Sequence, residues 1–128
     1  DGMLIPPSTD WTWMSYQKLG MKEEALNVLN NVNDDTKVSD DDRDYKKRVL
    51  LYQGKLDPEE FYKNIDKTDD LIGMAEYYGL SNYYYYVLGD VKRSVELQEQ
   101  VLAYTTYHHA FAYKSALREI DQRRAEIE

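Results

Sequence analysis

Three glycines, Gly20, Gly54 and Gly89, divide the chain at intervals of 34 and 35 residues. Each stands between two segments whose apolar residues recur at helical spacing, and period-two alternation longer than four residues is absent from the sequence. Glycine commonly ends an α-helix, because it enters the left-handed backbone region without steric cost. The spacing therefore predicts an all-α chain with one pair of helices per period, joined by a tight turn at each glycine.

Capping residues and apolar stripes predict seven helices. Ser39 precedes three aspartates that favour the positive end of a helix dipole, and Asp57 precedes a proline suited to a first helical position. The expected helices cover about residues 9–19, 21–32, 39–54, 57–65, 68–89, 91–104 and 107–127. On the last of these, the residues expected to face the core are Ala110, Tyr113, Leu117, Ile120 and Ile127.

Length and composition exclude several classes of protein. A chain of 128 residues corresponds to one domain or a short repeat array, and zero cysteines exclude disulfide frameworks and thiolate metal sites. The net charge of -8 argues against nucleic acid or an anionic membrane surface as a partner. No apolar run reaches the length of a membrane span, so membrane insertion is not expected.

The Asp-Gly start suggests a mature product or a piece of a longer protein. A cytoplasmic location is favoured, and a periplasmic one stays open if a signal lies upstream.

The turn segments resemble tetratricopeptide repeats, whose period is 34 residues with one helix pair per repeat. The sequences around Leu19-Gly20 and Leu88-Gly89 resemble the turn of that repeat, with Ala25 and Ser94 five places after the glycine. Beyond the bare repeat, several tracts look like the C-terminal region of uncharacterised bacterial tetratricopeptide proteins loosely called NlpI-like. The resemblance covers about residues 9–104. It implies a right-handed α-solenoid of three hairpins, at about 9–32, 39–65 and 69–104, plus a C-terminal helix at about 107–127, all in a single domain 1–128.

No catalytic residues and no cofactor are expected. His108 and His109 are adjacent, so they diverge on a helix and cannot share a metal; the favoured interpretation packs one and leaves the other in water. The acidic segment from Asp34 to Asp44 lacks the glycine and glutamate of a calcium loop, which favours a solvated acidic loop. The common signatures of catalysis are absent from the sequence, so an enzyme is the least favoured function.

Six tyrosines lie between Tyr77 and Tyr86, and the four consecutive ones sweep about 300° around a helix. They cannot all face a core, so inter-repeat packing and an exposed binding surface are equally favoured. In the second case Tyr83 and Tyr86 would face a concave groove while Tyr78 and Tyr85 face the core. The predicted groove residues are Trp13, Met14, Gln17, Arg48, Tyr52, Glu76, Gly79, Tyr83 and Tyr86.

These features predict a non-catalytic scaffold that binds a protein or peptide on the concave face of its repeats. A partner with apolar or basic side chains is expected, because aromatic rings attract cations and the net charge is -8. The alternative is a structural segment that caps a longer superhelix or mediates self-association.

Overall fold

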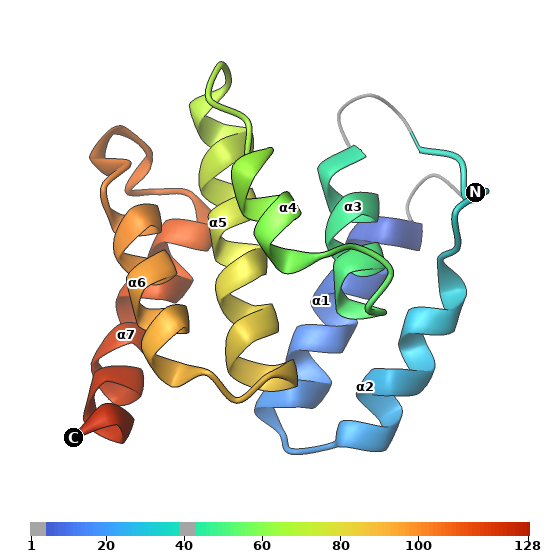
Figure 1. Cartoon of the computed structure of the whole chain (residues 1–128), viewed down its shortest axis with the longest axis horizontal. Helices are drawn as coiled ribbons and strands as arrows, with labels where there is room; N and C mark the ends of the chain where they lie inside the picture. Colours follow the sequence, from blue (N-terminus) through green and yellow to red (C-terminus); the bar gives the residue numbers. More distant parts are fainter. Residues whose placement is uncertain (1–4, 39–42) are drawn as a thin grey trace. The chain divides into compact units, whose positions relative to one another are not determined.

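The computed structural model describes residues 5–38 and 43–128, and within these ranges every regular element is helical and no strand occurs. The described residues thus confirm the all-α prediction. The chain divides into two compact units, residues 1–57 and 58–128 (Figure 1). The predicted cap Ser39 and the carboxylates Asp40, Asp41 and Asp42 lie outside the described residues. None of the described helices is both long enough and apolar enough to cross a membrane.

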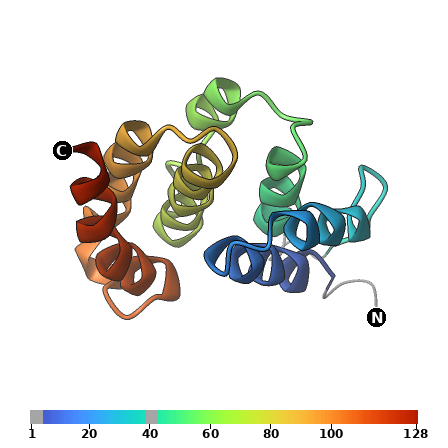
Figure 2. The same ribbon diagram turned by 90° about the horizontal axis from the view of Figure 1, so that it is seen from below.

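The first unit contains three α-helices. α1 (Ile5–Lys18) and α2 (Lys22–Val28) lie side by side and run in opposite directions, α2 continues as the 3-10 turn η2 (Leu29–Asn31), and α3 (Arg43–Tyr52) packs on α1 (Figures 1 and 2). α1 begins earlier than the predicted residue 9. The reason is that its first turn can hold prolines, because the first N–H groups of a helix have no partner within the helix.

The second unit is built around one long helix. α5 (Asp70–Asn82), extended by the π-helical segment η4 (Tyr83–Val87), packs against α4 (Pro58–Lys63), α6 (Val91–Leu102) and α7 (Phe111–Ile127). A short 3-10 turn, η5 (Thr105–Tyr107), joins α6 to α7. α6 runs antiparallel to α5, and α7 packs on both of them (Figure 1).

The three glycines lie at inter-helix turns, as predicted. Their φ angles are positive: +75° at Gly20, +80° at Gly54 and +66° at Gly89. At the first turn the N–H of Met21 donates to the carbonyl of Tyr16 at 2.9 Å, and at the second the N–H of Lys55 donates to the carbonyl of Leu50 at 3.0 Å. Both bonds span five residues, as in the Schellman motif that ends a helix at a glycine.

The third turn contains one additional residue. The N–H of Asp90 donates to the carbonyl of Tyr84 at 2.8 Å, which spans six residues, and the N–H of Leu88 donates to Tyr83 at 3.2 Å across five. The interval from Gly54 to Gly89 is also one residue longer than the interval before it. The extra residue is therefore accommodated as the π-helical segment η4, since a π-turn holds one more residue than an α-turn.

α7 buries a different stripe from the predicted one. Leu117 and Ile127 are 56% and 46% exposed, so the prediction that they face the core is wrong. The buried residues of α7 are Ala112, Ser115, Ala116, Ile120 and Arg123. The physical reason is that Arg123, which is 2% exposed, donates hydrogen bonds to side chains inside the unit. A polar residue therefore occupies a core position.

Gly73 in the first turn of α5 allows the preceding loop to approach the helix backbone. A Cβ atom built on Gly73 would lie 2.4 Å from the carbonyl oxygen of Asp66. The same loop is held to α5 by a hydrogen bond of 2.9 Å from the N–H of Asp66 to Oε1 of Glu76. Because the clash is with backbone, a side chain here requires the loop to move.

Replacing Gly73 with Ala is expected to lower the free energy of unfolding by roughly 2 kcal/mol, the usual cost of overpacking. An ordinary glycine inside a helix gives the opposite sign, a gain of about 1 kcal/mol on replacement by alanine. Urea unfolding followed by circular dichroism measures the change. A variant as stable as the parent, or more stable, would show that the loop does not depend on this approach.

Candidate functional site

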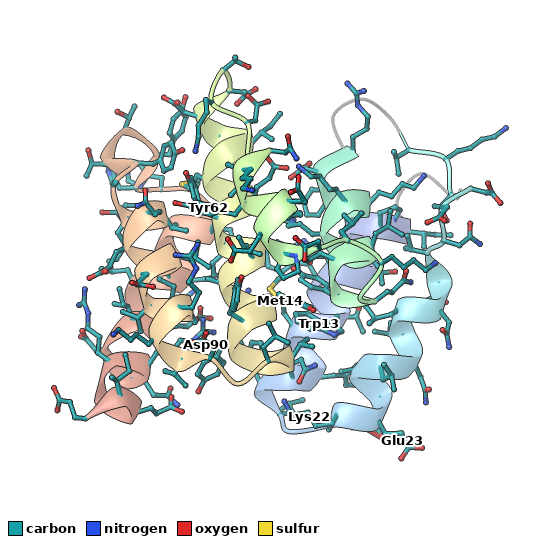
Figure 3. The ribbon with its side chains drawn as sticks, viewed as in Figure 1. Trp13, Met14, Lys22, Glu23, Tyr62 and Asp90 are labelled. Carbon is teal, nitrogen blue, oxygen red and sulfur yellow. The ribbon has the colours of Figure 1, made fainter. Side chains whose placement is uncertain are left out.

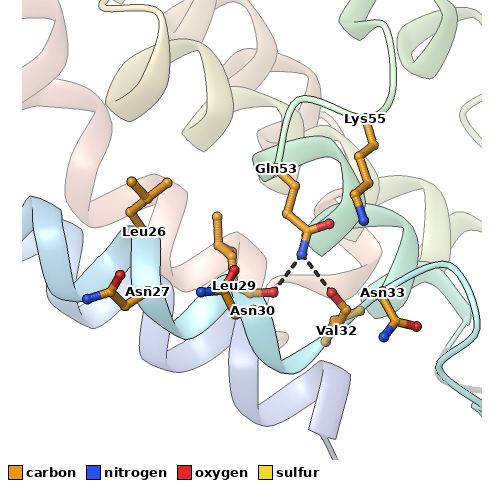
Figure 4. A pocket seen from close by; sticks show the side chains of 8 residues that line it. All are labelled: Leu26, Asn27, Leu29, Asn30, Val32, Asn33, Gln53 and Lys55. Carbon is orange, nitrogen blue, oxygen red and sulfur yellow. Dashed lines mark hydrogen bonds between the residues drawn. The ribbon is translucent and has the colours of Figure 1, made fainter.

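A groove of about 490 Å³ lies in the first unit between the end of α2 and the end of α3 (Figure 4). Its walls combine amide side chains, one lysine and three aliphatic residues. The lining residues are Leu26, Asn27, Leu29, Asn30, Val32, Asn33, Gln53 and Lys55. Amides both donate and accept hydrogen bonds, so this lining suits a ligand that carries both kinds of group.

Gln53 fixes the two walls relative to each other. Its Nε2 donates to the carbonyl of Leu29 at 2.6 Å and to the carbonyl of Val32 at 2.7 Å (Figure 4). Carbonyl groups at a helix end need partners from outside the helix, and Gln53 supplies one for this end of η2. Its Oε1 is buried and accepts no hydrogen bond within the protein. This oxygen is a buried acceptor beside the groove.

Three asparagines line one wall at intervals of three residues. Asn27, Asn30 and Asn33 are exposed, and Oδ1 of Asn33 accepts a bond of 2.8 Å from the N–H of Asp35. Asn27 and Asn30 lie on the same side of the helix because they are three positions apart, and Asn33 continues the row from the extended segment after η2. At the end of the row the ammonium of Lys55 lies 4.0 Å from Oδ1 of Asp34, and both side chains are exposed. The groove thus ends at a paired cation and anion.

Sequence reasoning missed this groove. The available signal was the i, i+3, i+6 spacing of Asn27, Asn30 and Asn33. Asparagine is usually exposed, however, so this spacing does not by itself indicate a binding site. The partner wall could not be inferred, because Gln53 lies more than twenty residues further along the chain than the carbonyl groups it binds.

The predicted groove residues of the first unit form a packed cluster. Trp13, Met14, Arg48 and Tyr52 are at most 4% exposed, and Gln17 is half-buried. The Trp13 and Tyr52 rings stack with centroids 3.8 Å apart and planes 6° apart. Trp13 and Met14 project from neighbouring positions on α1 (Figure 3). In this conformation the face of the Trp13 ring contacts the face of the Tyr52 ring.

Arg48 forms a buried ion pair with Asp10, which sequence reasoning did not link to it. The Nη2 of Arg48 lies 3.0 Å from Oδ2 of Asp10, and the two side chains are 5% and 1% exposed. Burial raises the pKa of Asp10 above its usual 3.8, although the charge of Arg48 and the nearby hydroxyl of Tyr52 act in the opposite direction. Desolvation prevails because Oδ1 of Asp10 is buried without a hydrogen bond.

The predicted groove residues of the second unit are also largely enclosed. Glu76 and Tyr83 are 3% and 7% exposed, Gly79 is buried, and Tyr86 is half-buried. Tyr78 faces the core at 2% exposure as predicted, but the expectation that Tyr85 is buried and Tyr83 exposed is wrong. Tyr83 begins the π-helical segment and Tyr85 lies inside it, where the additional residue changes the angular step from that of an α-helix.

The tyrosine hydroxyls of this segment are bonded to carboxylates. The hydroxyl of Tyr84 donates to Glu59 at 2.8 Å and that of Tyr85 donates to Glu126 at 2.6 Å. Desolvation, together with the hydrogen bond to the carboxylate, raises the pKa of each phenol to about 12. These phenols stay protonated at neutral pH and act as donors that tie η4 to α4 and α7.

The two histidines do not take the predicted arrangement. Both are exposed, so the interpretation that one of them packs inside is wrong. Their ring centroids lie 3.9 Å apart, and Nδ1 of His108 lies 3.1 Å from the carbonyl oxygen of Thr105. Among residues 5–38 and 43–128, no group of three or more histidine, cysteine, aspartate or glutamate side chains is arranged to hold a metal ion.

Comparison with known proteins identifies no relative: no protein-family model, curated protein or solved structure matches this chain. The tetratricopeptide resemblance and the single repeat domain therefore stay predictions.

Replacing Arg48 with Met is expected to lower the free energy of unfolding by about 3 kcal/mol at neutral pH, because a buried carboxylate loses its cation. Without the guanidinium, the folded-state pKa of Asp10 rises further above its unfolded value. The folded variant then holds a proton that the unfolded chain releases, so its stability is greatest at low pH and falls as the pH rises. Unfolding by urea at about pH 4.5 and about pH 8 measures this difference.

The matched control for this experiment is the double variant Asp10→Asn with Arg48→Met, which removes both charges. Its stability is expected to depend on pH no more than that of the parent. If Arg48→Met alone loses the same stability at both pH values, Asp10 is not the group that titrates.

Proposed function

We propose that this chain is a non-catalytic helical module that binds an extended segment of another protein. Its hairpins would stack as a right-handed solenoid of the tetratricopeptide type. Support for the stacking comes from the turns at Gly20 and Gly54, which close with the same five-residue bond 34 residues apart. Repeats of this kind bury their apolar faces only against neighbouring repeats.

The groove between α2 and α3 carries the proposal. Three positions along a helix advance about 4.5 Å in an α-helix and about 6 Å in a 3-10 helix. Peptide groups on one side of an extended strand recur every 6.6 Å or so. Asn27 and Asn30 therefore have a spacing along the helix a little below that of an extended main chain, and an amide can bond both the N–H and the carbonyl of a peptide.

The side chains of the bound segment are expected to be mainly apolar. Leu26 is 66% exposed at the edge of the groove, and Leu29 and Val32 lie in its lining. Lys55 and Asp34 compensate each other at the far end, so no strong local charge selects an acidic segment. The net charge of -8 favours a neutral or basic partner during association.

Replacing Asn27 and Asn30 together with Ala is expected to weaken binding of an extended peptide at least about 10-fold, because two neutral hydrogen bonds are lost. The peptide would be selected from a random-sequence display library, and its affinity measured by calorimetry. Asn31→Ala is the matched control, since Asn31 lies on the same segment but outside this groove. Equal weakening by the control, or no weakening by the double variant, would exclude the groove as the binding surface.

Self-association is a second candidate, and a specific observation favours it. α7 leaves three large apolar side chains in solvent: Phe111 at 45%, Leu117 at 56% and Ile127 at 46% exposure. Leu117 and Ile127 lie about 80° apart around α7, so a second copy of the chain would cover both on one side of the helix.

If α7 mediates self-association, the mass measured by light scattering will rise with protein concentration, and Leu117→Glu will abolish the rise. Arg118→Glu is the control, because it changes an exposed neighbour on the same helix without removing apolar surface. A mass that stays constant across the dilution series would eliminate this candidate and leave the peptide-binding proposal unaffected.

A further inference from the structure

Lys67 lies in the loop between α4 and α5, where its solvent-exposed side chain contacts a tyrosine. Its ammonium donates a hydrogen bond to the hydroxyl of Tyr77 and lies 4.8 Å from the centre of that ring. Tyr62 and Tyr104 also help to raise the pKa of this ammonium. The ammonium thus bonds one phenol and has two more in its surroundings.

The three phenols form one connected cluster, called the phenol cage from here on. The rings of Tyr62 and Tyr77 lie edge to face, with centroids 6.1 Å apart and planes 68° apart, and the rings of Tyr77 and Tyr104 lie 6.2 Å apart at 43°. Tyr77 is 5% exposed and forms the base, whereas the other two are half-buried and form the sides. Tyr62 projects from α4 (Figure 3).

The phenol cage lies beside two carboxylates, and the guanidinium of Arg93 lies 4.7 Å from the centre of the Tyr62 ring. Asp66 and Asp70 lie close enough to Tyr104 to raise the pKa of its phenol, although burial is the largest cause of that rise. The hydrogen bond to Tyr77 is the main reason that the pKa of Lys67 lies above its usual value, so this ammonium stays charged. Phenol oxygens, aromatic rings and carboxylates together are the groups that bind ammonium ions in proteins.

The backbone beneath Lys67 is fixed, but its side chain is exposed. Oδ1 of Asp66 accepts bonds from the N–H of Thr68 at 2.7 Å, from its hydroxyl at 2.7 Å and from the N–H of Asp69 at 3.0 Å. The loop is also tied to α5 through Glu76. Lys67 can therefore leave the cage by side-chain rotation alone, with no movement of the backbone.

We propose that the phenol cage is a recognition site for a lysine side chain of a partner protein, and that Lys67 occupies it in the free protein as an internal substitute. Binding exchanges one ammonium for another: Lys67 rotates into water and the partner's ammonium takes its bonds to the phenols. This site belongs to the second unit and is independent of the groove proposed above.

The test uses the full chain and a small probe, Nα-acetyl-lysine methylamide, with binding followed by NMR chemical-shift changes. Lys67→Ala removes the internal occupant, so this variant is expected to bind the probe at least about 5-fold more tightly than the parent. Lys92→Ala is the matched control, because it removes an exposed lysine of α6 with the same change in charge. It is expected to bind like the parent.

Two further measurements test the chemistry of recognition. Adding Tyr77→Phe to Lys67→Ala removes one hydroxyl and keeps the ring, and it is expected to reverse most of the gain. The same probe with its ε-amine acetylated carries no charge and is expected not to bind. The proposal is overturned if Lys67→Ala binds no better than the parent, if Lys92→Ala gains equally, or if the neutral probe binds as well as the charged one.

Discussion

The guanidinium of Arg123 joins the three long helices of the second unit. From α7 it donates to Oγ of Ser94 on α6 at 2.9 Å and to Oδ1 of Asn82 on α5 at 3.1 Å, and it lies 3.6 Å from Glu119. A buried cation is costly unless such partners surround it, so the helices are restrained to the alignment in which all three are present. Leucines packed in the same space would tolerate small shifts that this arrangement does not.

In the first unit a buried arginine also joins two helices, but it has fewer partners. Asp10 and Arg48 link α1 to α3 inside a largely apolar interior, next to the stacked rings of Trp13 and Tyr52. In both units, polar residues that would be expected at the surface from the sequence are buried in the core. The surfaces proposed for binding lie at the margin of each core: amides along one wall of the groove, and the phenol cage, whose base Tyr77 is buried and bonded to Lys67.

Local signals in the sequence were sufficient for the helices and the turns. Glycine conformation and helix capping depend on a few neighbouring residues, so the three turn glycines and the start of α4 at Pro58 could be predicted. The inward face of α7 could not, because Arg123 is buried by partners about 29 and 41 positions away. The candidate sites were missed for the same reason, since each brings together residues from separate helices and loops.

The run of four tyrosines lies within the π-helical segment, and this coincidence has a consequence for how the chain can change. Deleting any one of Tyr83, Tyr84, Tyr85 or Tyr86 gives the same shorter sequence. A single deletion anywhere in the run would therefore restore a 34-residue interval and remove the additional residue from the turn. The π-helical and α-helical forms of this turn are therefore separated by the deletion of a single tyrosine, and the choice of tyrosine does not matter.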